Sequence, residues 1–198
     1  MINNIYNQTG YLMNKRVYNI AMQYVVLLRG INVGGNNKVS MSTLKTFLLR
    51  AGFEDVKTYI NSGNLLLKSN LPLRDVNYLV EDVIEKTFGF KVYALTLEES
   101  TFKNIANTIP NEWMNNSDMK CDVMFLWPDI NNSKIMEKLI IKPDIDSIKY
   151  VAGAILWSVN RVNINKSGLL KIVGTDIYKK ITVRNCNTVR KLNSLLDY

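Results

Sequence analysis

The chain has 198 residues, a hydrophobic content of 47% and a formal net charge of +8, a composition that excludes disorder over most of its length. It contains no histidine, which excludes Ser-His-Asp triads, Cys-His dyads and histidine metal sites. The longest apolar run near the N-terminus, Tyr24 to Leu28, is far shorter than the roughly 20 residues of a membrane-spanning helix, so no membrane association is predicted.

Residues 1–21 form a leader that differs from the rest of the chain. They are rich in asparagine and tyrosine and lack the apolar stretch of about 7–15 residues that a secretory signal needs. The absence of acidic residues leaves a mitochondrial-type presequence open, although Arg16 is the only arginine. Since Met22 stands directly before the first strand pattern, we predict that 1–21 is a disordered, dispensable extension rather than a functional arm.

Residues 22–97 predict a first α+β unit. The pattern gives, in order, a strand (23–31), a helix capped by Ser40 (41–51), two strands around a tight turn (56–69), a helix (76–88) and a strand (91–97). β-Branched residues mark the strands, and apolar residues three and four apart mark the helices. The order is therefore β-α-β-β-α-β.

Residues 98–198 predict a second unit of the same kind. The pattern gives a helix (98–107), a strand (121–127), a helix (133–141), a hairpin about Gly153 (145–160), a short helix (166–173), a strand (179–185) and a terminal helix (187–195). We therefore predict a duplicated ferredoxin-like α+β protein with antiparallel or mixed sheets. A single mixed sheet with helices on both faces is the alternative.

A glycine-rich loop follows the first strand. Strand, glycine loop and helix start is the arrangement in which backbone N–H groups and the helix dipole hold an anion. The P-loop and GxGxxG patterns are both absent, so a nucleotide triphosphate site is not predicted. The candidate anion or polar-ligand loop comprises Arg29, Gly30, Asn32, Gly34, Gly35 and Lys38. The alternative is a structural corner, in which the glycines supply positive φ values and Arg29 pairs with a carboxylate.

Two further polar motifs interrupt apolar segments. The first lies in the turn between the two middle strands of the first unit and comprises Asn61, Ser62, Gly63 and Asn64. Turn formation accounts for these residue types, but carboxamides also bind the polar edges of a base or sugar, so the motif is a candidate specificity patch.

The second polar motif enters the last helix and comprises Arg184, Asn185, Asn187 and Thr188. Asn187 or Thr188 can cap that helix, which accounts for part of the motif and leaves Arg184 and Asn185 unexplained. All four residues are candidate ligand-binding residues. Cys186 is a lone cysteine without a base, and we assign it no catalytic role.

The positive charge is concentrated near the C-terminus. The last 39 residues hold eight basic and two acidic side chains, a net charge of +6, whereas residues 22–159 hold 15 of each sign. A local basic surface attracts polyanions or an acidic ligand, and a solvated face that keeps the protein soluble is the alternative. The two cysteines give neither a disulfide framework nor zinc spacing, so a reduced, cytoplasmic protein without a metal site is predicted.

The chain resembles the bacterial family known as the domain of unknown function 1697 family. The resemblance rests on YVVLLRGINVGGNNKVSMSTLKTFLLRAGFEDVKTYINSGNLLL, GAILWSV and TVRNCNTVRKL, which together extend over residues 22–192. It implies a fold and marks the three polar motifs, apart from Lys38, without implying a reaction. The sequence departs from the family at Cys186, where the family has tryptophan, and at Arg161, which matches the family motif only loosely.

We predict from these motifs a protein that binds a small anionic or nucleotide-like ligand or a nucleic-acid segment. A histidine-independent transferase or hydrolase acting on a phosphate- or acyl-bearing metabolite is the alternative, and an oligomeric scaffold is a second. The sequence assigns no catalytic residue and no cofactor, and it leaves the oligomeric state open.

Overall fold

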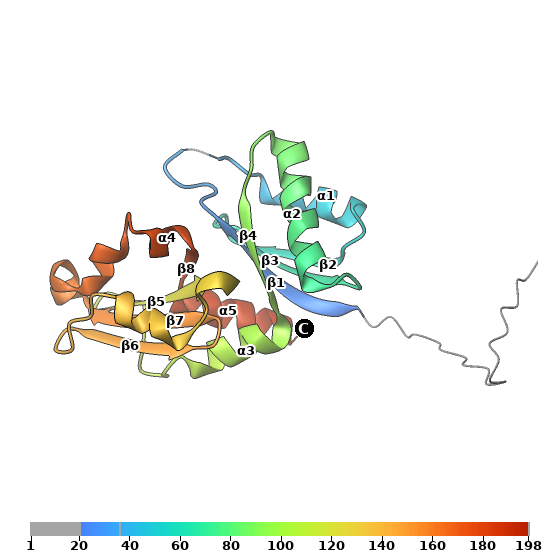
Figure 1. Ribbon diagram of the computed structural model, residues 1–198. Coiled ribbons are helices and arrows are strands. Elements are labelled where there is room, and N and C mark those ends of the chain that lie inside the picture. Colours follow the sequence, from blue (N-terminus) through green and yellow to red (C-terminus); the bar gives the residue numbers. More distant parts are fainter. Residues whose placement is uncertain (1–20, 36, 198) are drawn as a thin grey trace, which may run out of the picture.

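The computed structural model of the protein describes residues 21–35 and 37–197 (Figure 1). The predicted leader lies, apart from Ala21, outside the described residues, and its disorder therefore stays a prediction. Within the described part of the chain, no helix is long and apolar enough to cross a membrane.

The first half of the chain forms a four-stranded antiparallel sheet in the order β2-β3-β1-β4. Its strands are β1 (Met22–Arg29), β2 (Glu54–Tyr59), β3 (Asn64–Ser69) and β4 (Tyr93–Glu98). Strand β1 is central, and both of its faces are covered, since Val26 packs in one apolar cluster and Val25 in another. This double burial explains why β1 reads as an unbroken apolar run.

Two helices cover the face of this sheet that carries Val26. Helix α1 (Met41–Arg50) begins at Ser40, whose hydroxyl accepts a hydrogen bond from the Thr43 backbone N–H, as its capping pattern predicts. Helix α2 (Leu73–Phe88) ends at Gly89, which has a φ of +80°. The predicted β-α-β-β-α-β order of the first unit is thereby confirmed.

The second half repeats the sheet of the first half. Its strands are β5 (Met119–Leu126), β6 (Asp146–Val151), β7 (Ala154–Asn160) and β8 (Ile181–Asn185). They are antiparallel and lie in the order β6-β7-β5-β8, which is the first order with each strand replaced by its counterpart. The prediction of a duplicated α+β fold is therefore confirmed, and both sheets are antiparallel.

The connections of the second unit differ from the prediction. The expected helices over 133–141 and 166–173 are absent. The connections contain short elements instead, namely η1 (Pro128–Ile130), η2 (Ser133–Lys138), η3 (Arg161–Lys166), η4 (Gly168–Ile172) and the four-residue α4 (Asp176–Lys179). The η elements are 3₁₀ turns. In η2 only Ile135 is buried, and helices are stabilised mainly by burying a full apolar face, so packing does not favour a longer helix there.

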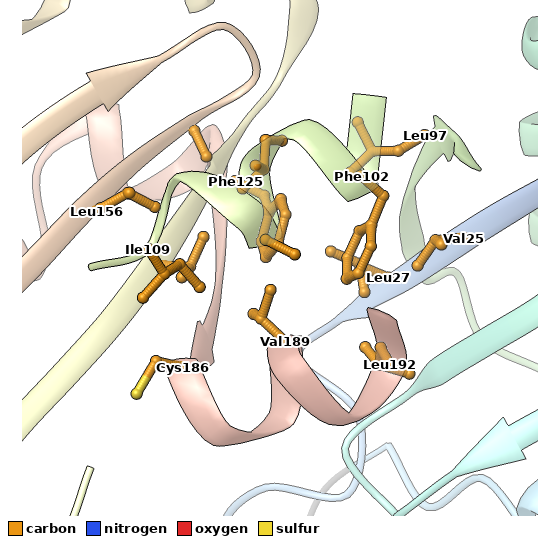
Figure 2. Packing of buried hydrophobic residues seen from close by; sticks show 14 of the residues in the cluster. Val25, Leu27, Leu97, Phe102, Ile109, Phe125, Leu156, Cys186, Val189 and Leu192 are labelled. Carbon is orange, nitrogen blue, oxygen red and sulfur yellow. The ribbon is translucent and has the colours of Figure 1, made fainter. Parts of the chain in front are cut away.

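Helices α3 (Glu99–Thr108) and α5 (Cys186–Leu196) join the two sheets into one structure. Their apolar side chains enter a cluster that includes Leu27 of the first sheet and Phe125 of the second (Figure 2). The rings of Phe102 and Phe125 stack with centroids 5.7 Å apart. The two sheets are thus held at a fixed separation by a shared apolar layer.

A buried carboxylate secures the loops that cover the second sheet. Asp146 is 5% exposed and accepts hydrogen bonds from the backbone N–H groups of Lys142 (3.0 Å) and Gly168 (2.9 Å), from Trp157 Nε1 (3.2 Å) and from the Ser167 hydroxyl. Burial alone would raise the pKa of Asp146, but these four donors favour the charged form and lower the pKa below its usual value.

We expect Asp146→Asn to lower the free energy of unfolding at neutral pH by about 2 kcal/mol, because an amide cannot accept all four hydrogen bonds. A carboxyl group whose pKa is lower in the folded than in the unfolded protein stabilises the folded state when the pH is above the unfolded-state pKa. This stabilisation is lost as the pH falls through the folded-state pKa. The difference between the wild type and the variant should therefore shrink in acid. Urea unfolding at about pH 7 and about pH 3 measures it.

Asp144→Asn is the matched control, because Asp144 is an exposed carboxylate in the same connection. It should change the free energy of unfolding by less than about 0.5 kcal/mol at both pH values. A loss in Asp146→Asn that stays constant between the two pH values would contradict the role of the charge.

Candidate functional site

The three polar motifs meet where strand β8 lies beside the end of β1. The Arg184 guanidinium extends from β8 across to the first sheet. Its Nη2 donates to the backbone carbonyls of Leu28 (2.8 Å), Ser62 (3.0 Å) and Gly63 (3.2 Å). One side chain of the third motif thereby connects the second motif to the strand that carries the first.

Arg184 is a buried cation without an acidic partner. It is 8% exposed, and its remaining N–H groups donate to the side-chain oxygen atoms of Asn64 and Thr182 and to the carbonyl of Val183. Every ion pair within 21–35 and 37–197 involves other residues. Burial lowers the pKa of Arg184 to about 10, which still leaves it charged at neutral pH. The junction therefore carries a positive charge that no described carboxylate neutralises.

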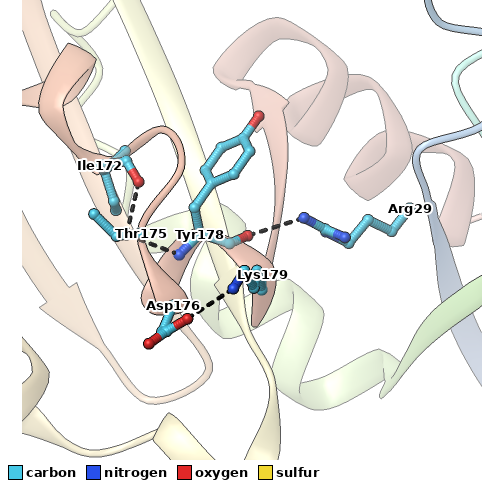
Figure 3. A network of polar contacts seen from close by, with 6 residues as sticks. All are labelled: Arg29, Ile172, Thr175, Asp176, Tyr178 and Lys179. Carbon is cyan, nitrogen blue, oxygen red and sulfur yellow. Dashed lines mark hydrogen bonds and ion pairs between the residues drawn. The ribbon is translucent and has the colours of Figure 1, made fainter.

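Arg29, at the end of β1, also makes contact with the second half of the chain. Its Nε donates to the Ile181 carbonyl (3.0 Å) and its Nη2 to the Tyr178 carbonyl (3.1 Å), and its guanidinium lies 5.8 Å from the centre of the Tyr178 ring (Figure 3). The described part of the chain supplies no acceptor for its Nη1. The alternative interpretation of Arg29, a pair with a carboxylate, is thus not found among the described residues.

The two arginines line a cavity of about 390 Å³ between the halves of the chain, which we call the junction cavity. Its walls come from the end of β1 and the loop after it, from the β2–β3 turn, and from α4 and β8. The lining residues are Leu28, Arg29, Gly30, Ile31, Val33, Ser62, Tyr178, Ile181, Thr182, Val183 and Arg184. None is acidic, and five are aliphatic. The cavity thus combines positive charge with an apolar wall.

The glycine loop separates the junction cavity from a second hollow of about 660 Å³ at the start of α1. Its lining residues are Asn32, Gly35, Lys38, Val39, Ser40, Met41, Ser42 and Asn61. Lys38 is exposed and makes no ion pair with the described residues, while Gly34 lies in the exposed turn of the loop. The predicted loop residues are therefore divided between two hollows.

Two of the predicted carboxamides make contacts inside the protein. The Asn32 side chain accepts from the Val39 N–H (2.8 Å) and donates to the Val39 and Asn61 carbonyls (3.0 and 2.7 Å), which fixes the path of the loop. Asn64 is fully buried and donates to the Tyr59 carbonyl (3.0 Å) and the Ser62 hydroxyl (3.1 Å). Contacts within the protein therefore orient both side chains.

The start of α5 lies outside both hollows. The prediction that Asn187 or Thr188 caps this helix is wrong: Asn185 is the cap, since its Oδ1 accepts from the Thr188 N–H at 2.9 Å. Asn187 is exposed and donates to the Asn115 carbonyl (2.9 Å), and Thr188 is buried. Helix capping and loop attachment account for these three residues without a ligand.

Part of the charge of the basic C-terminal segment lies inside the protein or in ion pairs. Arg184 is buried, and Arg190 donates to the Trp113 and Pro110 carbonyls, both at 2.8 Å. Lys179 pairs with Asp176 at 2.8 Å, and Lys180 pairs with Asp129. Much of the +6 charge is therefore directed inward or neutralised locally.

Sequence reasoning identified Arg184 on β8 but missed Tyr178 on α4 and Ile181 on β8, which also line the junction cavity. Tyr178 belongs to the four-residue α4, which is too short to give a periodic pattern, and its carbonyl rather than its phenol fixes Arg29. The described residues contain no group of three or more histidine, cysteine, aspartate or glutamate side chains placed to hold a metal ion.

The comparisons with known proteins agree with this fold. A search of the curated proteins gives no match. The structure is similar to that of the conserved bacterial protein SP0830 from Streptococcus pneumoniae, with a TM-score of 0.76 and 26% sequence identity over 89% of this chain and 99% of that one. The profile of the family described as "Protein of unknown function (DUF1697)" matches residues 22–157, which include the first two motifs but not the third. Because the matched residues make up more than half of this chain, the chain belongs to the DUF1697 family of proteins of unknown function.

Proposed function

We propose that this is a cytoplasmic protein that binds a small anionic ligand in the junction cavity. The observation that carries the proposal is that two arginines, Arg29 and Arg184, line the same cavity and that none of its lining residues is acidic. A buried cation is costly unless an anion or a set of dipoles compensates it, and here only dipoles do so. A phosphate or carboxylate group entering the cavity would supply the missing negative charge.

The two arginines have different roles in this proposal. Arg184 uses its donors on six protein acceptors, so it contributes a fixed positive field rather than a free hydrogen-bonding edge. Arg29 donates only through Nε and Nη2, and its Nη1 is available to an acceptor outside the described chain. Arg29 is therefore the residue that hydrogen-bonds the ligand.

The remaining wall points to a ligand with an apolar or aromatic body. Five aliphatic residues and Tyr178 line the cavity beside the arginines. Cavities that bind small molecules have volumes of about 300–1,000 Å³ and are mostly apolar, with few polar groups. The size and lining of the junction cavity favour a compact nucleotide-like or acyl-type anion over a nucleic-acid segment, whose phosphates need an extended row of unpaired cations.

Arg29→Gln tests the proposal by calorimetry with inorganic phosphate, pyrophosphate, adenosine monophosphate and citrate as probes. Loss of a charge-assisted hydrogen bond costs about 1.5–3 kcal/mol, so any of these probes that binds the wild type should bind the variant about 10- to 100-fold more weakly. Arg50→Gln is the control, because Arg50 also lies against an aromatic ring, 5.3 Å from that of Phe47, but is remote from the cavity. It should bind like the wild type.

Thermal unfolding of the same variants separates binding from folding. Arg29→Gln should unfold within about 4 °C of the wild type, the shift expected for the loss of about 1 kcal/mol. A much larger drop would assign Arg29 to the structure alone. Equal binding by Arg29→Gln and the wild type would contradict the proposed site, and salt-sensitive binding of random-sequence RNA in place of these probes would favour the nucleic-acid hypothesis.

A further inference from the structure

The two cysteines of the chain lie against each other between the sheets. The register of β5 and β8 ends with Asp122 opposite Asn185, so Cys121 and Cys186 are the next residues beyond this pair, one on each side. Both residues are fully buried in the same apolar cluster, both thiols are free, and each thiol affects the pKa of the other. Residues opposite each other in an antiparallel pair have Cα atoms about 4.5–5.5 Å apart, which is within the range that a disulfide spans.

The two sulfur atoms have different surroundings. Cys186 is the first residue of α5, and Nη1 of Arg190, one turn further along this helix, lies 3.6 Å from its sulfur. Hydrogen bonds from Arg190 to the Trp113 and Pro110 carbonyls hold the guanidinium in place. A positive charge and a helix N-terminus both favour a thiolate. The charge of Arg190 also reaches Cys121, but Cys186 is the residue in direct contact with it and at the start of the helix.

The pKa values of the two thiols move in opposite directions as a result. The neighbouring Cys121 thiol and the charge of Arg190 lower the pKa of Cys186 to about 7, against the opposing effects of burial and of Asp122. The neighbouring Cys186, together with burial, raises the pKa of Cys121. Cys186 is therefore the nucleophilic member of the pair and Cys121 the protonated one.

Cys186 lies only one layer below the surface. Its sulfur is 3.6 Å from the Trp113 carbonyl and 3.5 Å from Oδ1 of Asn187, which is an exposed residue. The neighbouring Met114 is 46% exposed. A local opening of the segment around Trp113 and Met114 would admit hydrogen peroxide to Cys186.

We propose that Cys186 and Cys121 form a peroxide-sensitive redox pair that closes to an intramolecular disulfide. The Cys186 thiolate attacks one oxygen of hydrogen peroxide, the O–O bond breaks, and the released hydroxide takes up a proton to become water, leaving Cys186 as a sulfenic acid. The Cys121 sulfur then attacks the sulfenic sulfur, the S–O bond breaks, and the hydroxyl leaves with the Cys121 proton as a second water. Peroxide is reduced by two electrons and the thiol pair is oxidised by two.

The consequence of oxidation is a covalent link between β5 and the start of α5. This link lies in the apolar layer that joins the two sheets, two residues beyond Arg184 in the chain. It does not depend on a ligand in the junction cavity, so it can be tested whether or not the proposed anion binding is correct.

The experiment exposes the full-length folded protein to hydrogen peroxide at neutral pH, unfolds it, and counts the remaining thiols. The wild type should go from two free thiols to none, with an intact mass lower by two hydrogen atoms and a Cys121–Cys186 cross-linked peptide after proteolysis. In Cys121→Ser the reaction should stop at a Cys186 sulfenic acid that dimedone captures. In Cys186→Ser the Cys121 thiol should remain reduced.

The wild-type measurement decides the proposal even if a serine variant folds poorly. Retention of both thiols, under conditions that oxidise the same chain unfolded in urea, would overturn it. A cross-link between two chains, or a Cys186 sulfinic acid without a disulfide, would overturn it as well. Equal oxidation of the two single variants would contradict the assignment of Cys186 as the attacking sulfur.

Discussion

Replacing Arg184 with methionine is expected to lower the free energy of unfolding by about 3 kcal/mol or more, among the largest losses that single substitutions cause. Methionine fills most of the space but donates no hydrogen bond. The carbonyls of Leu28, Ser62 and Gly63 and the side chain of Asn64 would then each lose a buried donor. Removing the buried charge recovers part of this cost, because its desolvation is no longer needed.

Arg161→Met is the matched control for this substitution. Arg161 also donates to a backbone carbonyl, that of Asn116, but it is exposed, so water can replace the lost donor. Its loss should cost less than about 1 kcal/mol. Urea unfolding of both variants measures the difference, and equal losses would show that Arg184 does not hold the two halves together.

Gly63→Ala should also lower the free energy of unfolding by about 3 kcal/mol, because backbone strain and a steric clash add. Gly63 has a φ of +78°, where an L-residue is strained. A Cβ atom there would also lie 2.7 Å from Cβ of Leu28 and 2.9 Å from Cδ1 of Ile31, both on the strand and loop that form the junction cavity. Relief of this clash would have to move the wall that carries Arg29.

Gly89→Ala separates the clash from the strain. Gly89 has a φ of +80°, close to that of Gly63, but no atom within 4 Å of an added Cβ. Gly89→Ala should therefore lower the free energy of unfolding by the backbone strain alone, about 1 kcal/mol. Thermal or urea unfolding of the two alanine variants gives the comparison, and similar losses in both would mean that the β2–β3 turn does not need close contact with β1.

The sequence predicted the fold well where a single local signal determines an element. The apolar run of β1, the Ser40 cap of α1 and the stop of α2 at Gly89 each match the structure, because burial, capping and positive φ leave marks in neighbouring residues. The prediction of helices over 133–141 and 166–173 was wrong for the opposite reason. Their apolar residues were enough to suggest helical spacing, but contacts with the second sheet set the outcome, and sequence periodicity does not report those contacts.

The candidate site was predictable only in parts. The three motifs stood out because asparagine, arginine and glycine interrupt apolar strands, yet their meeting depends on how the two sheets pack through α3 and α5. The carboxamides of Asn32 and Asn64 looked like recognition groups, but the loop and the turn use them to satisfy backbone carbonyls. Side-chain type alone does not distinguish a polar group that binds a ligand from one that holds a loop.

The central claim is that the junction cavity holds an anion against Arg29. A crystal of the protein grown with selenate tests it most directly, because the anomalous signal of selenium locates the anion. The expected result is a peak within hydrogen-bond distance of Nη1 of Arg29, inside the cavity that Arg184 and Tyr178 also line. Peaks at exposed lysines with none in the cavity would contradict the claim.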